Sequence, residues 1–257
     1  MNKLKELGYP VKIYLYIVLF IATVIGMKFV TEIKLPNGGR SPYLFLIWNT
    51  FLAWIPVGLV IVLDAVSLLK NKLSRRLLYL VFGLVWLFFY PNAAYMITDL
   101  LHPFARYPVS GYRFWQDMPF WDHLFTVLFV ALLGLALGNV SLASVHHLVR
   151  KSYGSVVGWV FAVVILALSS FGVYLGRFNR WNSWDIMKRP GYVLRDMFDY
   201  FTDMENLKHT LDFCKWIFII TLFSYVILYL FGMIRNHSVH PNNASSKSQL
   251  FSTEKVE

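Results

Sequence analysis

The sequence predicts an all-α membrane protein: a polytopic bundle of about six transmembrane helices, with one amphipathic helix on the outer surface. Two features of composition support this fold class. The chain is 57% hydrophobic and only 15% charged, whereas a soluble domain usually carries about a quarter charged residues. Its apolar residues also gather in blocks of roughly 20, the length of helix that crosses a ~30 Å hydrocarbon core. Water is therefore not the solvent for most of this chain.

Six apolar blocks define the expected spans, and they cover residues 11–30, 42–69, 77–101, 121–147, 154–176 and 213–234. The first block follows Lys3 and Lys5, has Lys12 at its start and has no small-residue cleavage site after it, so we expect it to stay in the protein as a signal anchor. The spans make up a transmembrane domain, residues 11–234. A short N-terminus, residues 1–10, precedes it, and a polar tail, residues 235–257, follows it. The tail is poor in aromatic residues and is predicted to be disordered.

Basic residues in the short loops predict the orientation. The loop after the second block and the loop after the fourth block contain Lys70, Lys72, Arg75, Arg76, Arg150 and Lys151. With six crossings, these loops lie on the same side as the lysine-rich N-terminus, and the positive-inside rule makes that side cytoplasmic. Both termini are therefore expected in the cytoplasm.

The chain has 24 Lys plus Arg against 14 Asp plus Glu. This excess is explained by orientation and by contact with anionic lipid headgroups, so membrane lipids are expected partners. Nucleic acid is not expected, because no basic stripe with interleaved aromatic residues lies outside the apolar blocks. The single cysteine, Cys214, excludes an intrachain disulfide and a multi-cysteine metal site.

A second pattern lies in the loop before the last block. Between residues 192 and 211 the apolar residues recur at three and four: Val193, Leu194, Met197, Phe198, Phe201, Met204, Leu207 and Leu211. This periodicity predicts an amphipathic helix. The helix either lies on the outer membrane surface or docks on the bundle.

Small residues at four-residue spacing predict close helix packing. Gly134 and Gly138 lie in the fourth block, and Gly154, Gly158 and Ala162 lie at the start of the fifth. Such residues let neighbouring backbones approach closely in membranes. A dimer face is the second interpretation of the same pattern.

Polar residues from four spans converge toward the outer side. Asn49 lies about seven residues, or ~10 Å, from the outer end of its block. The third block ends in a stripe with steps of three, four and three residues, which places its polar side chains on one helix face. The fourth block begins, and the fifth ends, with further charged and amide groups. The candidate outer polar site comprises Asn49, Asn92, Tyr95, Asp99, His102, Asp122, Arg177, Arg180, Asn182 and Asp185.

Four segments together resemble a known family. LIWNTFLAWIP, FYPNAAYMITDL, FWDH and GRFNRWNSWD, in this order and spacing, are similar to the bacterial multi-pass membrane proteins of domain of unknown function 1361, over about residues 44–185. The resemblance implies a protein of the bacterial cytoplasmic membrane with these segment boundaries. It implies no reaction and no cofactor.

The chemistry of the polar site has three open interpretations. Asp99, His102, Asp122 and Asp185 offer the oxygen and imidazole ligands of a divalent metal ion, without a fixed ligand motif. Arg177 and Arg180 instead fit either salt bridges to these carboxylates or an anion site for phosphate. We expect Asp99 to pair with one of the two arginines. At the cytoplasmic side, we expect Asp64 to pair with Lys70.

Three functions are compatible with this site. The first is binding or modification of a lipid or cell-envelope precursor, with the arginines on its headgroup and Asp99 or Asp122 as a base. The second is a non-catalytic scaffold that docks a protein partner. A transporter is disfavoured, because the polar groups lie toward one side and no internal repeat is visible.

Overall fold

The computed structural model describes residues 2–107, 114–179, 191, 195 and 204–238. These residues form helices and no strand. Six of the helical segments are long and apolar enough to cross a membrane: Val11–Glu32, Phe45–Ser67, Lys72–Arg106, Met118–Tyr153, Ser155–Phe178 and Met204–Met233. The predicted all-α membrane bundle is confirmed.

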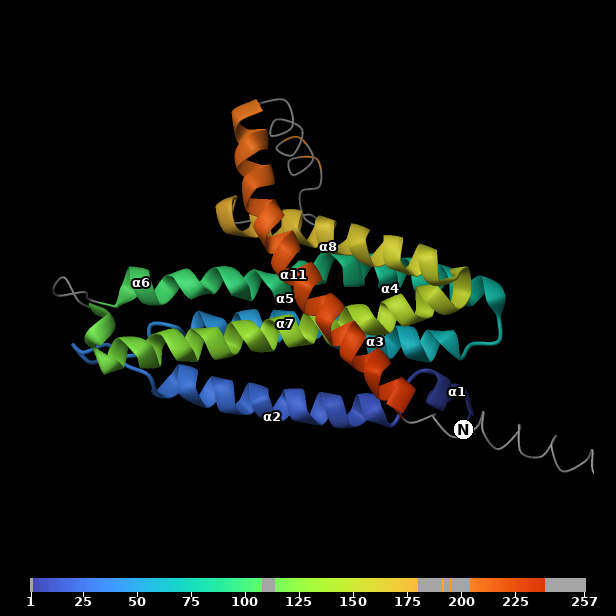
Figure 1. The fold of residues 1–257 in the computed structure, drawn as a ribbon, viewed down its shortest axis with the longest axis horizontal. Helices are drawn as coiled ribbons and strands as arrows, with labels where there is room; N and C mark the ends of the chain where they lie inside the picture. The colour runs from blue at the N-terminus through green and yellow to red at the C-terminus, as the bar shows by residue number, and fades with distance from the viewer. Residues whose placement is uncertain (1, 108–113, 180–190, 192–194, 196–203, 239–257) are drawn as a thin grey trace, which may run out of the picture.

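Figure 1 shows how the helices are arranged. In chain order they are α1 (Asn2–Glu6), α2 (Val11–Glu32), α3 (Phe45–Ser67), α4 (Lys72–Phe89), α5 (Pro91–Tyr95), the 3-10 helix η1 (Met96–Leu101), α6 (His102–Arg106), the 3-10 helix η2 (Phe114–Gln116), α7 (Met118–Tyr153), α8 (Ser155–Phe178) and α11 (Met204–Ser238). The loops after α3 and α7 lie at the same end of the bundle as α1, and α6 lies at the opposite end (Figure 1).

α7 is the central helix. It packs against α2, α3, α5, η1, α8 and α11. Its buried face carries Val127, Val130, Leu133 and Leu137, which join residues of α2, α3 and α5 in one apolar core. α11 crosses obliquely over α7 and α8 instead of aligning with them (Figure 1).

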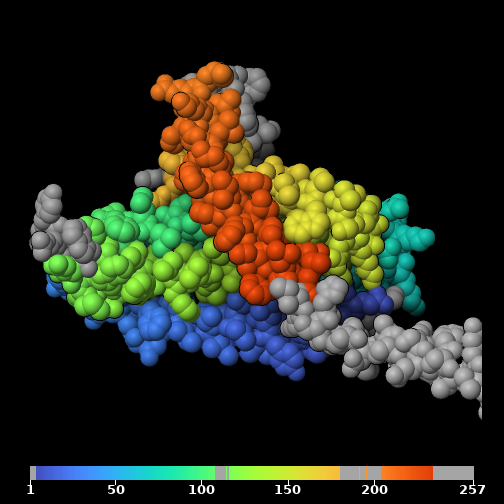
Figure 2. Space-filling model, in the orientation of Figure 1, coloured from blue at the N-terminus to red at the C-terminus, as the bar shows by residue number. Residues whose placement is uncertain are grey.

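The surface of the bundle is largely apolar. Phe20 on α2, Leu80 on α4 and Val160 on α8 are more than half exposed. Such a surface is what a lipid solvent requires, since lipid tails solvate apolar side chains and leave polar ones unsatisfied. The start of α11 projects beyond the body of the bundle (Figure 2).

The third expected helix, residues 77–101, lies within Lys72–Arg106, which is long and apolar enough to cross a membrane but divides into α4, α5, η1 and α6. α4 ends at Phe89, and Pro91, which has no backbone N–H, starts the short helix α5. The chain then continues as η1 and α6. A Cβ on Gly172 of α8 would lie 2.7 Å from the Pro91 ring, and one on Gly134 of α7 would lie 2.7 Å from the Ala93 carbonyl oxygen. The irregular backbone is thus enclosed by protein, the setting in which a membrane tolerates it.

The expected amphipathic segment falls mostly outside the described residues. Of residues 192–211, the structure describes Arg195 and residues 204–211. Residues 204–211 form the first turns of α11, so the last helix begins nine residues before the expected residue 213. At the other end α11 continues to Ser238, past the expected start of the tail at residue 235, and residues 239–257 lie outside the described part.

Candidate functional site

Asp99 lies in η1, at the end of the bundle opposite α1, and only 1% of its surface is exposed. Its Oδ2 atom accepts a hydrogen bond of 2.9 Å from Asn49 Nδ2 on α3. His102 follows one turn later; its Nδ1 atom lies 3.0 Å from the Asp99 carbonyl oxygen and 3.6 Å from Oδ1. Oδ1 itself has no hydrogen-bond partner. The buried carboxylate is therefore held on one oxygen and left without a close donor on the other.

Two guanidinium groups act on this carboxylate. Arg106 at the end of α6 and Arg177 in the last turn of α8 both interact electrostatically with Asp99 and His102. Arg106 donates a hydrogen bond to the Pro42 carbonyl oxygen, and its guanidinium carbon lies 5.1 Å from the centre of the Phe45 ring.

Arg177 differs from Arg106. Within the described part of the chain, the half-buried Arg177 side chain forms no ion pair and no hydrogen bond. The expected direct pair between Asp99 and Arg177 is thus replaced by a longer-range interaction, and Arg180, the other expected partner, lies outside the described residues. We call Asn49, Asp99, His102, Arg106 and Arg177 the Asp99 site.

The other candidates have different surroundings. Tyr95 packs against a small apolar cluster of Ala94, Val173 and Ile217. Asn92 donates a 2.9 Å hydrogen bond to the Phe89 carbonyl oxygen at the helix break. Asp122 is exposed at the start of α7. Arg180, Asn182 and Asp185 lie outside the described residues.

The metal interpretation required several ligands at one point. Among the described residues there is no group of three or more His, Cys, Asp or Glu side chains that could hold a metal ion. Asp99 and His102 contribute two such groups. His123, next to Asp122, has both ring nitrogens engaged, with the Tyr43 hydroxyl at 2.8 Å and the Lys34 carbonyl oxygen at 3.3 Å.

Arg106 was not among the site residues expected from the sequence. A signal for it existed, because Arg106 follows His102 by four residues and so continues the polar stripe of the third span by one turn. The nearby Phe45 ring, 4.6 Å from the His102 ring and in contact with Arg106, had no such signal. Its role depends on how α3 packs against α6.

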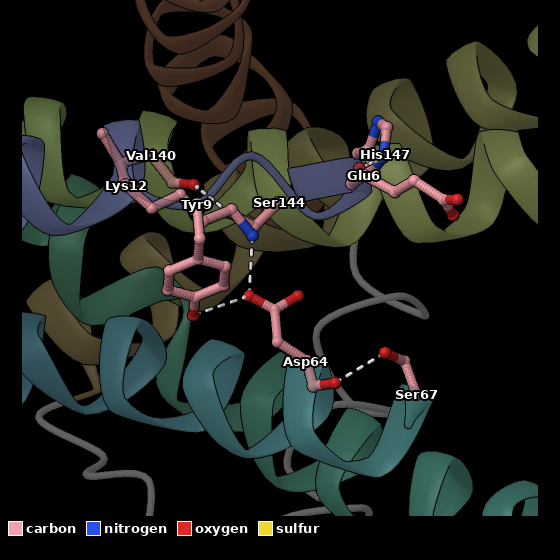
Figure 3. Close-up of polar contacts among 8 residues, drawn as sticks. All are labelled: Glu6, Tyr9, Lys12, Asp64, Ser67, Val140, Ser144 and His147. Atoms are coloured by element: carbon pink, nitrogen blue, oxygen red, sulfur yellow. Dashed lines mark hydrogen bonds and ion pairs between the residues drawn. The ribbon is translucent and has the colours of Figure 1, made fainter. Parts of the chain in front are cut away.

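A second buried carboxylate lies at the end of the bundle near α1 (Figure 3). Asp64 of α3 accepts hydrogen bonds on Oδ2 from Lys12 Nζ at 2.7 Å and from the Tyr9 hydroxyl at 3.1 Å. The expected partner, Lys70, was wrong, because the N-terminal segment folds back onto α3 and supplies a closer ammonium group. Burial and the Asp64 charge raise the pKa of Tyr9 well above its usual range, so this hydroxyl stays protonated and donates.

Glu6 connects the same segment to α7. Its carboxylate pairs with Lys151, and its carbonyl oxygen lies 2.9 Å from His147 Nε2. Together with the Asp64 contacts, these bonds fasten α1 and the start of α2 to two core helices. We call this group of residues, Glu6, Tyr9, Lys12, Asp64 and Lys151, the N-terminal clasp.

Comparison with known proteins identifies the family. Residues 48–230 match the model of a family described as "Protein of unknown function (DUF1361)". No curated protein and no solved structure matches the chain. The matched region includes all five residues of the Asp99 site and excludes α1 and α2. With its six candidate spans and a match over most of its length, this chain is a multi-pass membrane protein that belongs to the DUF1361 family.

Proposed function

We propose that the Asp99 site binds the anionic headgroup of a lipid or cell-envelope precursor. The observation that carries this proposal is the half-buried Arg177 guanidinium, which lies near a buried carboxylate and has no hydrogen bond or ion pair among the described residues. Ionisable groups within membrane spans are costly and commonly serve a ligand or an ion path. A scaffold role would instead favour closed pairs.

The charges of the site support an anionic ligand over a metal cation. Two guanidinium groups, Arg106 and Arg177, act on the single carboxylate of Asp99. Their excess positive charge repels a divalent cation and attracts an anion. Guanidinium groups also match phosphate oxygens with paired hydrogen bonds, which makes phosphate the best-suited anion.

The arrangement of Asp99 supports a role as acceptor or general base. Asn49 fixes one carboxylate oxygen, and the second oxygen is free of hydrogen bonds. A hydroxyl of the ligand that reached Oδ1 would find an acceptor for its proton at hydrogen-bond distance, the first requirement for general-base catalysis. His102 beside it is the second group able to carry a proton.

The site is proposed to face outward, in a bacterial cytoplasmic membrane with both termini in the cytoplasm. Support comes from the basic loops after α3 and α7, which lie at the α1 end, opposite the Asp99 site.

Cysteines placed at the exposed Ser74 and Ser152, in a Cys214→Ala background, should react with an impermeant maleimide only after the cells are opened. A cysteine at the exposed Asn37, in the opposite loop, should react in intact cells. Labelling of Ser74→Cys in intact cells would reverse the orientation.

If Arg177 binds a ligand, its replacement should weaken lipid binding without lowering the stability of the protein. Arg177→Gln should weaken retention of anionic phospholipid roughly tenfold or more, since a hydrogen bond to a charged group is worth ~1.5–3 kcal/mol. Its melting temperature in detergent should stay near that of the wild type, because Arg177 makes no hydrogen bond or ion pair with the described residues. Native mass spectrometry of the purified protein and a thermal unfolding scan measure the two quantities.

Arg40→Gln is the matched control. It removes the same charge from an exposed residue of the loop before α3, and Arg40 is not among the charges that act on Asp99. Its lipid retention should be unchanged. A structural role for Arg177 would give the opposite result: a lower melting temperature with full lipid retention.

A further inference from the structure

Resting on this proposed function, we infer the class of ligand and its route. The ligand is a phospholipid of the outer leaflet whose headgroup carries one net negative charge and a free hydroxyl, as a glycerol headgroup does. It reaches Asp99 sideways from the bilayer, between α3 and the η1–α6 segment.

The sideways route follows from what surrounds the polar centre. Asp99 is 1% exposed, whereas Trp48, next to Asn49, is 53% exposed and Leu101, next to His102, is 61% exposed. The Phe45 ring of α3 contacts His102 and Arg106. The two segments that hold the polar atoms therefore also carry exposed apolar side chains. In a membrane these exposed side chains face the bilayer, so a lipid can bring its headgroup to the site while its acyl chains stay in contact with them. A water-soluble ligand gains nothing from that contact.

The net charge of the headgroup follows from the charges at the site. Arg106 and Arg177 carry two positive charges, and the ionised Asp99 carboxylate supplies one negative charge. A phosphodiester with one negative charge balances them. A zwitterionic headgroup leaves one positive charge in excess. A phosphomonoester, with about −1.5 to −2 charges, brings too many negative ones. Uncompensated charge is costly at a partly buried site.

The hydroxyl follows from the second oxygen of Asp99. Oδ1 is buried and has no hydrogen-bond partner, and a buried acceptor without a donor carries a desolvation penalty. A headgroup hydroxyl supplies a donor while its phosphate stays with the arginines. A headgroup capped by a methyl group has the same charge but no donor. It can pair with Arg177, but it cannot donate a hydrogen bond to Asp99 Oδ1.

Three probes added to the purified full-length protein separate these claims by native mass spectrometry: phosphatidylglycerol, phosphatidylmethanol and the soluble diester glycerophosphoglycerol. Phosphatidylglycerol should bind at least about tenfold more tightly than phosphatidylmethanol, because only it can donate to Oδ1. It should also bind more tightly than the soluble diester, which lacks the apolar part.

Two variants test which residue makes each contact. Asp99→Leu should abolish the preference for phosphatidylglycerol over phosphatidylmethanol, because leucine has a similar branched shape and offers the headgroup hydroxyl neither an acceptor nor a donor. Arg177→Gln should weaken both lipids by the same factor and keep the preference. Arg40→Gln should change neither value. If Arg177→Gln weakens the binding of the two lipids by different factors, then Arg177 and Asp99 do not contact separate parts of the headgroup.

Each negative result of this experiment contradicts a different part of the proposal. Equal binding of phosphatidylglycerol and phosphatidylmethanol to the wild type overturns the hydroxyl contact and leaves the anionic site standing. Equal binding of lipid and soluble diester overturns the sideways route. Binding of none of the three probes overturns the proposed function itself.

Discussion

Replacing Lys12 with methionine should destabilise the protein in detergent by ~3–5 kcal/mol, the usual cost of leaving one partner of a buried ion pair uncompensated. The Lys12 and Asp64 side chains are 14% and 3% exposed, and their charged atoms lie 2.7 Å apart. Methionine keeps the apolar stem of lysine and removes the ammonium group, so Asp64 retains only the Tyr9 hydrogen bond. Reversible unfolding in mixed micelles measures the loss.

Lys28→Met is the matched control on the same helix. Lys28 pairs with Glu32 at 3.9 Å, and both side chains are more than 60% exposed. An exposed pair is worth ~1 kcal/mol or less. Adding Asp64→Asn to Lys12→Met should recover part of the lost stability, because it removes the orphaned charge. Equal stability of Lys12→Met and Lys28→Met would show that the N-terminal clasp contributes little.

Gly134→Ala should cost ~1–3 kcal/mol of stability, the usual range for an overpacked core, and should weaken lipid binding at the Asp99 site. The added Cβ would lie 2.7 Å from the Ala93 carbonyl oxygen and 2.7 Å from Met96 Sδ. The Met96 side chain can move, but the Ala93 oxygen moves only with the backbone of α5. That shift displaces η1 and changes the distance between Asp99 and Asn49.

Gly58→Ala provides the comparison. Gly58 lies within α3, and a Cβ there meets no atom within 4 Å. This substitution should leave stability unchanged or raise it by up to ~1 kcal/mol through helix propensity. Thermal unfolding and the lipid assay apply to both variants. If Gly134→Ala is as stable as Gly58→Ala and binds lipid as well as the wild type, the close contact does not position the site.

The sequence predicted those features that depend on length and hydrophobicity. The six spans follow from apolar blocks long enough to cross a bilayer, and each expected block overlaps a helix of the structure. The order of the spans then predicted Asn49, Asp99, His102 and Arg177 at one end. In the structure Asn49 and His102 lie close to Asp99, and Arg177 interacts with Asp99 and His102 at longer range. The alternating direction of successive spans was enough to predict this grouping, because it sets how far each residue lies from either end of the bundle.

Features that depend on packing were not predictable in the same way. The Asp64 partner, Lys12, is 52 residues away in sequence, and only the folded path of the N-terminal segment brings it closer than Lys70. The break after Phe89 depends on Pro91, which the sequence reveals. Its continuation as the 3-10 helix η1, which packs against α7, had no signal in the periodicity of the sequence.

The 3-10 geometry of η1 links the length of the third span to the direction in which the Asp99 side chain points. Six residues of 3-10 helix rise about 12 Å, where the same residues in an α-helix rise about 9 Å. Each 3-10 residue also turns by about 120°, compared with about 100° in an α-helix. Rewinding η1 into α-helix would therefore shorten the span by ~3 Å and rotate Asp99 away from Asn49. The length of this segment and the direction of the Asp99 side chain are therefore coupled, so an axial displacement of α6 that rewound η1 would also rotate Asp99.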